Sequence, residues 1–70
     1  MPIVVAPIGK TLRVIKILAD EKRKKHLESL GITIDSSVKI LSESGGSIIL
    51  AIKDGRLALD KGLATKIMVI

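Results

Sequence analysis

The dipeptide Asp54-Gly55 lies between two short apolar runs and is the strongest local structural signal in this chain. Asp-Gly suits the two central positions of a type I′ turn, where both residues take a positive φ. Alternate positions in residues 47–53 hold Ile48, Leu50 and Ile52, which share one face of a strand, and alternate positions in residues 56–59 hold Leu57 and Leu59. Alternation of this kind is typical of a strand with one buried face. The pattern therefore predicts a tight β-hairpin that packs on a core.

Three more segments have the β-branched content of short strands, namely residues 12–18, 37–42 and 66–70, although the alternation in 12–18 is imperfect. Gly45-Gly46 is expected to form a second hairpin tip, and residues 60–65 a single helical turn. Residues 1–6 are expected either to pair at a sheet edge or to remain loose. About five short strands joined by tight turns predict a mainly β fold. Closing them into a small barrel would leave no unpaired strand edge.

One segment has the pattern of a helix instead. Asp20 can cap its start, residues 22–30 are good helix formers, and Gly31 can end it with a positive φ. Leu27 and Leu30 are three positions apart, so they share a face. The segment is only weakly amphipathic and needs packing against a sheet to persist. We therefore expect one α-helix inserted between the first two strands.

Composition narrows the range of functions. Seventy residues make one domain, here residues 1–70, and the chain has no Phe, Tyr, Trp or Cys. Without aromatic rings it lacks the usual platform for stacking bases and the usual groove for Pro-rich peptides. The longest internal apolar run, residues 48–52, is too short to span a bilayer, so we expect a cytoplasmic protein. A net charge of +5 favours acidic partners or anionic surfaces.

The order of several segments resembles the FeoA family, the small partners of the FeoB ferrous iron transporter. The resemblance covers nearly the whole chain and implies an SH3-like barrel of about five strands with one inserted helix. It rests on an opening strand after a Pro/Gly turn, a basic helix running into Leu-x-x-Leu-Gly, a central hairpin and a Leu-Ala-Leu closing segment. The matching positions are Gly9, Leu12, Val14, Ile17, residues 26–32, Val38, Ile40, Leu41, Gly46, Ile48, Ile49, Asp54, Gly55, residues 57–59, Ala64, Ile67 and Val69.

Two positions depart from the family pattern. The family often has Thr-Pro-Gly after the helix, where this chain has Thr33-Ile34-Asp35. A turn can still form there, because Asp35 and the next residue, Ser36, favour turns. The family also often has Arg after the Leu-Ala-Leu segment, where this chain has Asp60. If that Arg contacts the transporter in relatives, this chain must dock differently.

The basic run of residues 22–25 is the most conspicuous charged feature. It is either a solvated helix face or a docking surface for an acidic patch or anionic lipid, with nucleic acid as a weaker alternative. Apolar residues of the helix and the following turn, Leu27, Leu30 and Ile34, either pack on the barrel or line a small groove that accepts a partner segment. The predicted partner-binding residues are Lys22, Arg23, Lys24, Leu27, Leu30 and Thr33.

We expect no catalytic, cofactor or metal site in this chain. His26 is the only histidine, and Glu28, two positions on, does not share its helix face. Transition-metal sites usually need three or four converging ligands, so a surface histidine is the simpler interpretation. Serines are present, but His26, the histidine that could act as their base, sits in a charged helix without an evident apolar pocket.

Two functions therefore remain open. The first is a non-enzymatic accessory of bacterial ferrous iron transport with no small-molecule substrate, which docks on the cytoplasmic side of a FeoB-like GTPase transporter and modulates its assembly or activity. It would be membrane-associated only through that partner, and homo-oligomers could form through an apolar strand such as residues 48–52. The alternative is a regulatory or nucleic-acid-associated module, because SH3-like domains of this kind also occur at the C-terminus of metal-dependent repressors. The chain shows no helix-turn-helix segment, which makes nucleic acid the less favoured partner.

Overall fold

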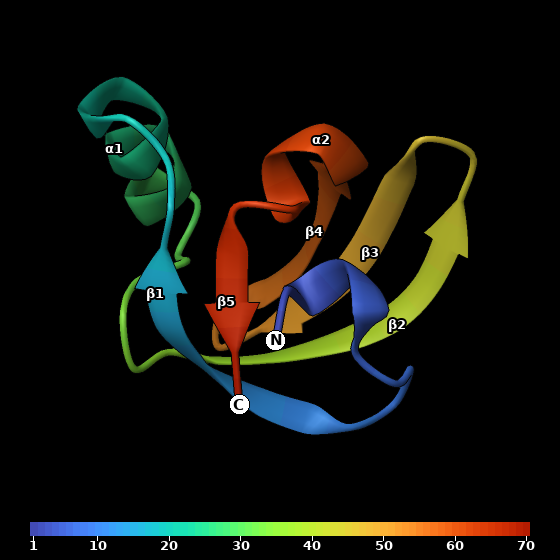
Figure 1. Ribbon diagram of the computed structural model, residues 1–70. Helices are drawn as coiled ribbons and strands as arrows, with labels where there is room; N and C mark the ends of the chain where they lie inside the picture. Colours follow the sequence, from blue (N-terminus) through green and yellow to red (C-terminus); the bar gives the residue numbers. More distant parts are fainter.

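The computed structural model describes residues 1–70, and one antiparallel sheet with the strand order β4-β3-β2-β1-β5 organises it (Figure 1). The strands are β1 (Thr11–Ile17), β2 (Ser37–Ser44), β3 (Ser47–Ile52), β4 (Gly55–Asp60) and β5 (Ile67–Val69). Helix α1 (Glu21–Ser29) connects β1 to β2, α2 (Lys61–Ala64) connects β4 to β5, and the 3₁₀ turn η1 (Ile3–Val5) precedes β1. The predicted mainly β fold with five strands and an inserted helix is confirmed.

A β-bulge explains why the alternation in β1 is imperfect. Leu12, Val14 and Ile17 are buried, which a strict period of two cannot produce. The register against β5 shifts between Val14 and Lys16, so one extra residue is inserted there. A bulge of this type leaves the extra residue off the ladder and bends the strand. Ile15 is consequently left on the solvent side, and Ile17 returns to the core.

The central hairpin forms as expected, but its turn does not. Ile52 pairs with Gly55, so the two turn residues are Lys53 and Asp54, and only Gly55 has a positive φ (+143°). The prediction of a type I′ turn centred on Asp54-Gly55 is therefore wrong. That register would place Lys53 directly opposite Arg56, and like charges opposite each other destabilise a sheet.

The sheet also fixes which strands remain available to a partner. Strand β3 pairs with β2 on one side and with β4 on the other. The expectation that residues 48–52 could pair between copies is therefore wrong, because both edges of that strand are already occupied. The Gly45-Gly46 tip joins β2 and β3 as predicted, with Ser44 opposite Ser47.

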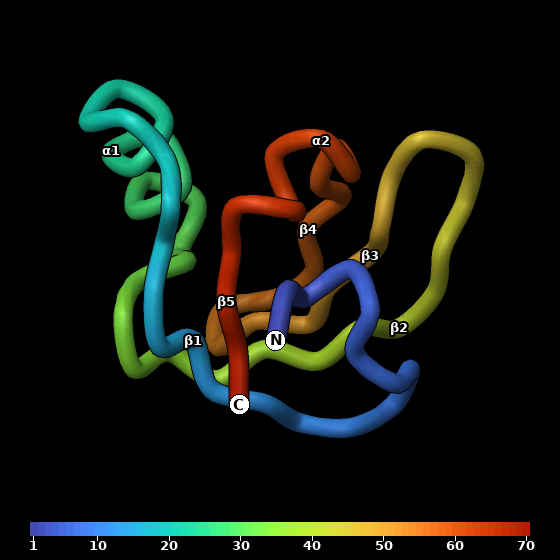
Figure 2. Tube along the Cα trace, in the orientation of Figure 1, coloured from blue at the N-terminus to red at the C-terminus, as the bar shows by residue number.

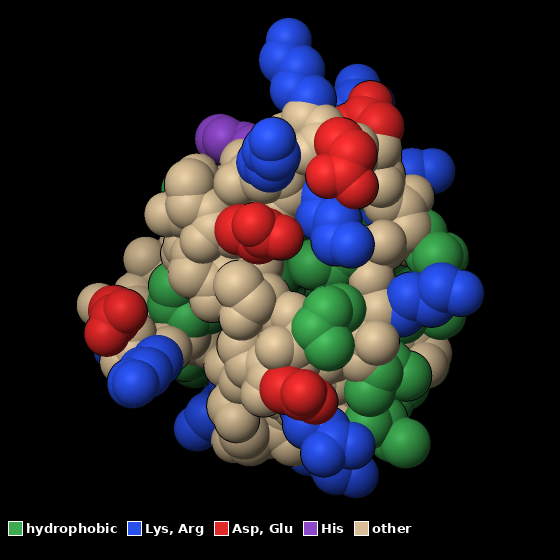
Figure 3. Space-filling model, turned by 90° about the vertical axis from the view of Figure 1, so that its left-hand side faces the viewer, with side chains coloured by type: hydrophobic (Ala, Val, Ile, Leu, Met, Phe, Trp, Pro, Cys, Tyr) green, Lys and Arg blue, Asp and Glu red, His purple; other side chains and the backbone are tan.

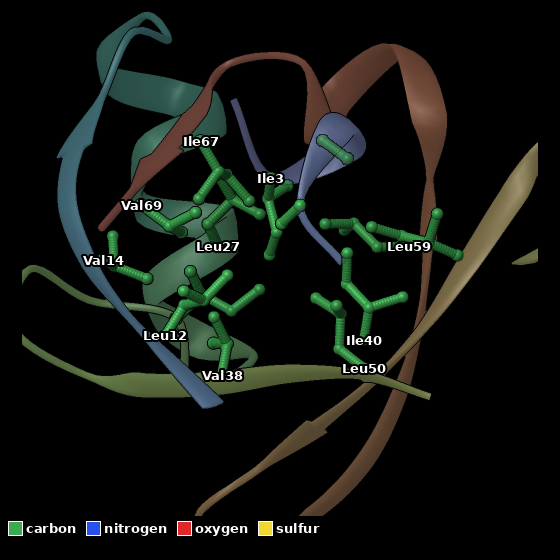
Figure 4. Close-up of a cluster of buried hydrophobic side chains, with 14 of the residues drawn as sticks. Ile3, Leu12, Val14, Leu27, Val38, Ile40, Leu50, Leu59, Ile67 and Val69 are labelled. Atoms are coloured by element: carbon green, nitrogen blue, oxygen red, sulfur yellow. The ribbon is translucent and has the colours of Figure 1, made fainter. Parts of the chain in front are cut away.

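The sheet curls into a barrel whose two edge strands, β4 and β5, are not paired with each other. The expected closure by strand pairing is replaced by packing of the N-terminal segment and α2 (Figure 2). Pro2 bridges Met68 on β5, and the Val69 amide donates to the Met1 carbonyl at 2.7 Å. Figure 4 shows the Ile3 side chain between Ile67 of β5 and Leu59 of β4. Residues 1–6 are thus part of the barrel, at the edge of β5.

The core is a single cluster of fifteen buried residues, all of them apolar. Every strand contributes to it, and α1, α2 and η1 each add one side chain, namely Leu27, Ala64 and Ile3. No buried side-chain nitrogen or oxygen lacks a hydrogen-bond partner. Stability therefore rests on packed aliphatic side chains, because the core holds no polar network.

Candidate partner-binding site

Helix α1 is built as its sequence predicts. The Arg23 amide donates to Asp20 Oδ1 at 2.9 Å, which confirms Asp20 as the N-cap. At the other end Gly31 takes a φ of +98°, and the Ile32 amide returns to the Leu27 carbonyl at 2.9 Å. That arrangement satisfies carbonyls that would otherwise be free at the helix end. Apart from these caps, Leu27 is the one residue that anchors α1 in the core.

One of the six predicted partner-binding residues is not at the surface. Leu27 has no exposed area, so it packs in the core and cannot meet a partner in this structure. Lys22 and Arg23 are exposed at the start of α1, and Thr33 is exposed beyond its end. Lys24 and Leu30 are half-buried. For the five accessible residues, partner binding stays a prediction.

The turn after the helix forms without the Pro-Gly pair of the family. Ser36 Oγ donates to the Thr33 carbonyl at 2.6 Å and accepts from the Thr33 amide at 3.2 Å. Asp35 takes a positive φ of +71°, a conformation that Asp tolerates better than most residues. Ile34 is 45% exposed, so of the two alternatives for this residue, packing in the core is ruled out and a place on the surface remains. The side-chain bonds of Ser36 replace the conformational restraint of the missing proline.

A groove lies between α1 and α2. It consists of two adjoining hollows of about 540 and 450 Å³ that share Arg23 and Leu63. The first is lined from α1, and the second mainly from α2 and its flanks. The complete lining is Asp20, Lys22, Arg23, His26, Asp60, Gly62, Leu63 and Lys66. We call this feature the α1–α2 groove.

The two carboxylates of the groove are already engaged. Asp20 caps α1, and Asp60 Oδ2 accepts from the Leu63 amide at 3.1 Å, which caps α2. The Arg23 guanidinium lies 3.5 Å from Asp20, an exposed pair that contributes little to stability. Lys22 and Lys66 form no ion pair, so they are the free charges of the groove. Figure 3 shows basic and acidic side chains intermixed at the top of the molecule, where α1 lies.

The charge reversal at Asp60 thus has a local structural reason, because the side chain starts α2. Sequence reasoning did not include Leu63 or Lys66 among the site residues. Residues 60–65 were recognisable as a helical turn, but no local signal shows that this turn faces the start of α1. The adjacency arises from the curl of the sheet, which brings the end of β4 towards α1.

The structure contains no group of three His, Cys, Asp or Glu side chains placed to hold a metal ion. His26 is exposed, and its carbonyl accepts from Ser29 Oγ at 2.6 Å within the helix. No helix has the length and apolar character needed to cross a membrane.

A curled five-stranded sheet with a helix inserted after its first strand defines a small SH3-like domain, and comparison with known proteins agrees. The FeoA domain model matches residues 1–70, so the chain belongs to the FeoA family. A Methanocaldococcus jannaschii protein, provisionally named Fe(2+) transport protein A, is 37% identical over 68 residues, covering 97% of this chain and 83% of its own. A crystal structure described as the iron uptake regulatory protein FeoA superposes with a TM-score of 0.89. It is 31% identical and covers 99% of this chain and 93% of its own.

The same fold also occurs inside a larger regulator. A manganese-dependent transcriptional repressor, solved in complex with manganese, matches with a TM-score of 0.90 and 28% identity. The match covers 100% of this chain, whereas it covers 35% of the repressor chain. This chain is therefore similar to one part of that repressor.

Proposed function

We propose that this FeoA-family protein is a non-enzymatic cytoplasmic accessory of ferrous iron transport. It docks on the cytoplasmic side of a FeoB-like GTPase transporter and modulates the assembly or activity of that transporter. Membership of the FeoA family and the name of the archaeal relative support the transport role. The observation that carries the docking role is the α1–α2 groove, where Lys22 and Lys66 stand unpaired beside Leu63.

The chemistry of the groove favours a short acidic segment with an apolar side chain. Its carboxylates would pair with Lys22 and Lys66, and its apolar group would cover Leu63, which is half-buried. Exposed charges such as these mainly raise the rate at which a complementary partner associates and the specificity for that partner. Binding should therefore weaken as salt is added.

A titration followed by NMR tests this proposal. The protein is labelled with nitrogen-15 and the soluble cytoplasmic part of a FeoB-like transporter from the same source is added. We expect amide shifts at residues 20–26 and 60–66, the two sides of the groove. Shifts confined to the strands, or none at high concentration, would remove the groove as the docking site.

A matched pair of charge reversals sharpens the test. Lys22→Glu alters the groove, whereas Lys53→Glu alters an equally exposed lysine in the β3–β4 turn. We expect the first to weaken transporter binding about fivefold or more, since one such contact is worth on the order of 1 kcal/mol. The second should bind like the wild type. Equal effects from both substitutions would indicate attraction by net charge alone.

The similarity to a repressor supports a second candidate, a regulatory module that associates with nucleic acid. Basic charge alone permits phosphate contacts with a steep salt dependence. A gel shift with duplex DNA at increasing salt distinguishes the two functions. A complex that survives physiological salt and prefers one DNA sequence would favour the regulatory role over docking.

A further inference from the structure

The outer face of β1 and β5 carries apolar side chains that the core does not use. Val14 and Val69 pair and point inwards, so their neighbours along each strand point outwards. Ile15 is 42% exposed and Ile70 is 66% exposed. Ile70 exchanges two backbone hydrogen bonds of 3.0 Å with Arg13, so the two residues are directly opposite each other on neighbouring strands. Arg13 precedes the inward-facing Val14 and therefore points outwards. Residues paired in this way lie on the same face of a sheet.

The face extends to both sides of Ile15. The turn over residues 34–36 lies against β1, because the Asp35 amide donates to the Val14 carbonyl at 2.7 Å. It brings Ile34, 45% exposed, to the border of the face. Leu18 is 51% exposed at the end of β1. Single exposed aliphatic residues are ordinary, but neighbouring ones on one surface mark an interaction site.

Basic residues lie among these apolar ones. Arg13 and Lys16 are both exposed on β1. Asp35 borders the face, but its carboxylate lies 3.9 Å from Arg13 Nε, so the guanidinium partly neutralises its negative charge. Figure 3 shows green apolar side chains with blue Lys and Arg side chains between them along the right-hand side. We call this combination of Ile15, Leu18, Ile34, Ile70, Arg13 and Lys16 the β1–β5 outer face.

We propose that the β1–β5 outer face binds the surface of an anionic lipid bilayer. Exposed aliphatic groups enter the headgroup region, and the basic residues meet anionic headgroups, as in other interfacial proteins. A second copy of the chain is disfavoured as the occupant, because a twofold contact would bring the basic residues of two identical faces, Arg13 and Lys16 of each copy, into one interface. This inference rests on the proposed transport function only for the expectation that a bilayer is nearby. The arrangement of residues on the face is observed independently of that function.

Co-sedimentation with lipid vesicles, without any transporter, tests the proposal. Vesicles contain either phosphatidylcholine alone or phosphatidylcholine with phosphatidylserine. We expect binding to the anionic vesicles that falls as salt rises. Lys16→Gln should weaken it about fivefold, as one basic residue near an anionic surface contributes about that much. Ile70→Ser should weaken it by a similar factor.

Two control variants keep the test specific. Lys53→Gln removes a lysine from the β3–β4 turn, and Ile8→Ser removes an aliphatic residue that is 60% exposed in the loop before β1. Both should bind vesicles like the wild type. Losses equal to those of Lys16→Gln and Ile70→Ser would overturn the proposal.

Other results would also overturn the lipid assignment. One is the absence of binding to anionic vesicles at low salt. Another is a wild-type dimer in sedimentation equilibrium that Ile70→Ser converts to a monomer, which would assign the face to a second copy. Either result leaves the α1–α2 groove titration unaffected, so failure of this inference and failure of the transporter docking can be told apart.

Discussion

Replacing Ile3 tests whether the N-terminal segment closes the barrel. Its side chain is fully buried in a core without polar side chains, and Figure 4 shows it between Ile67 of β5 and Leu59 of β4. Removing an aliphatic side chain from such a site costs about 2–5 kcal/mol, because transfer and cavity terms add. A 70-residue chain has a total stability of only about 4–10 kcal/mol. Ile3→Ala should therefore be strongly destabilised, and Ile3→Val should lose about 0.5–1.5 kcal/mol.

Urea unfolding followed by far-ultraviolet circular dichroism measures this, since the chain has no Trp or Tyr for fluorescence. Val5 provides the matched control, because it lies in the same 3₁₀ turn but is 65% exposed. Val5→Ala should change the free energy of unfolding by less than about 0.5 kcal/mol. The reasoning is refuted if Ile3→Ala costs no more than Val5→Ala, because the segment would then lie outside the cooperative fold.

Substitutions at three further positions test local structure by the same unfolding assay. Asp20→Ala should cost about 1 kcal/mol by removing the cap of α1, and Asp20→Asn, which can still cap, should cost much less. Gly31→Ala should cost at least about 1 kcal/mol, because the residue has a φ of +98° and the added Cβ would lie 3.1 Å from Ile52 Cδ1. Gly46→Ala meets no atom within 4 Å and has no positive φ, so it should be neutral or stabilise by up to about 1 kcal/mol. A loss at Gly46 equal to that at Gly31 would contradict the geometry assigned to both glycines.

Sequence patterns predicted an element correctly where its conformation depends on only a few neighbouring residues. The cap at Asp20, the helix end at Gly31 and the Gly45-Gly46 tip each depend on the conformation of their own segment. The turn centred on Asp54-Gly55 was misplaced because pairing along the whole of β3 and β4 sets the register. The conformational preference of two turn residues contributes less free energy than the hydrogen bonds and side-chain contacts between two complete strands.

The candidate site shows the same division. Lys22 and Arg23 stood out as part of a basic run, and both line the α1–α2 groove. Leu63 and Lys66 did not stand out, because their segment resembles any short helical turn. Leu27 was assigned to a binding surface although it is fully buried. A spacing of three residues shows that two side chains share a face, but not which neighbour that face meets.

The amino-acid sequence alone was enough to predict a mainly β, SH3-like domain with one helix after the first strand. That follows because alternation, capping and turn residues act over short distances, and because the order of those segments matches the FeoA family. The three-dimensional arrangement sets how the barrel closes, where α1 meets α2, and which aliphatic residues stay outside. Those features depend on contacts between distant segments, such as η1 with β5 and α2. A bulge at Ile15 and the curl of one sheet set them, and neither is encoded in a single local pattern.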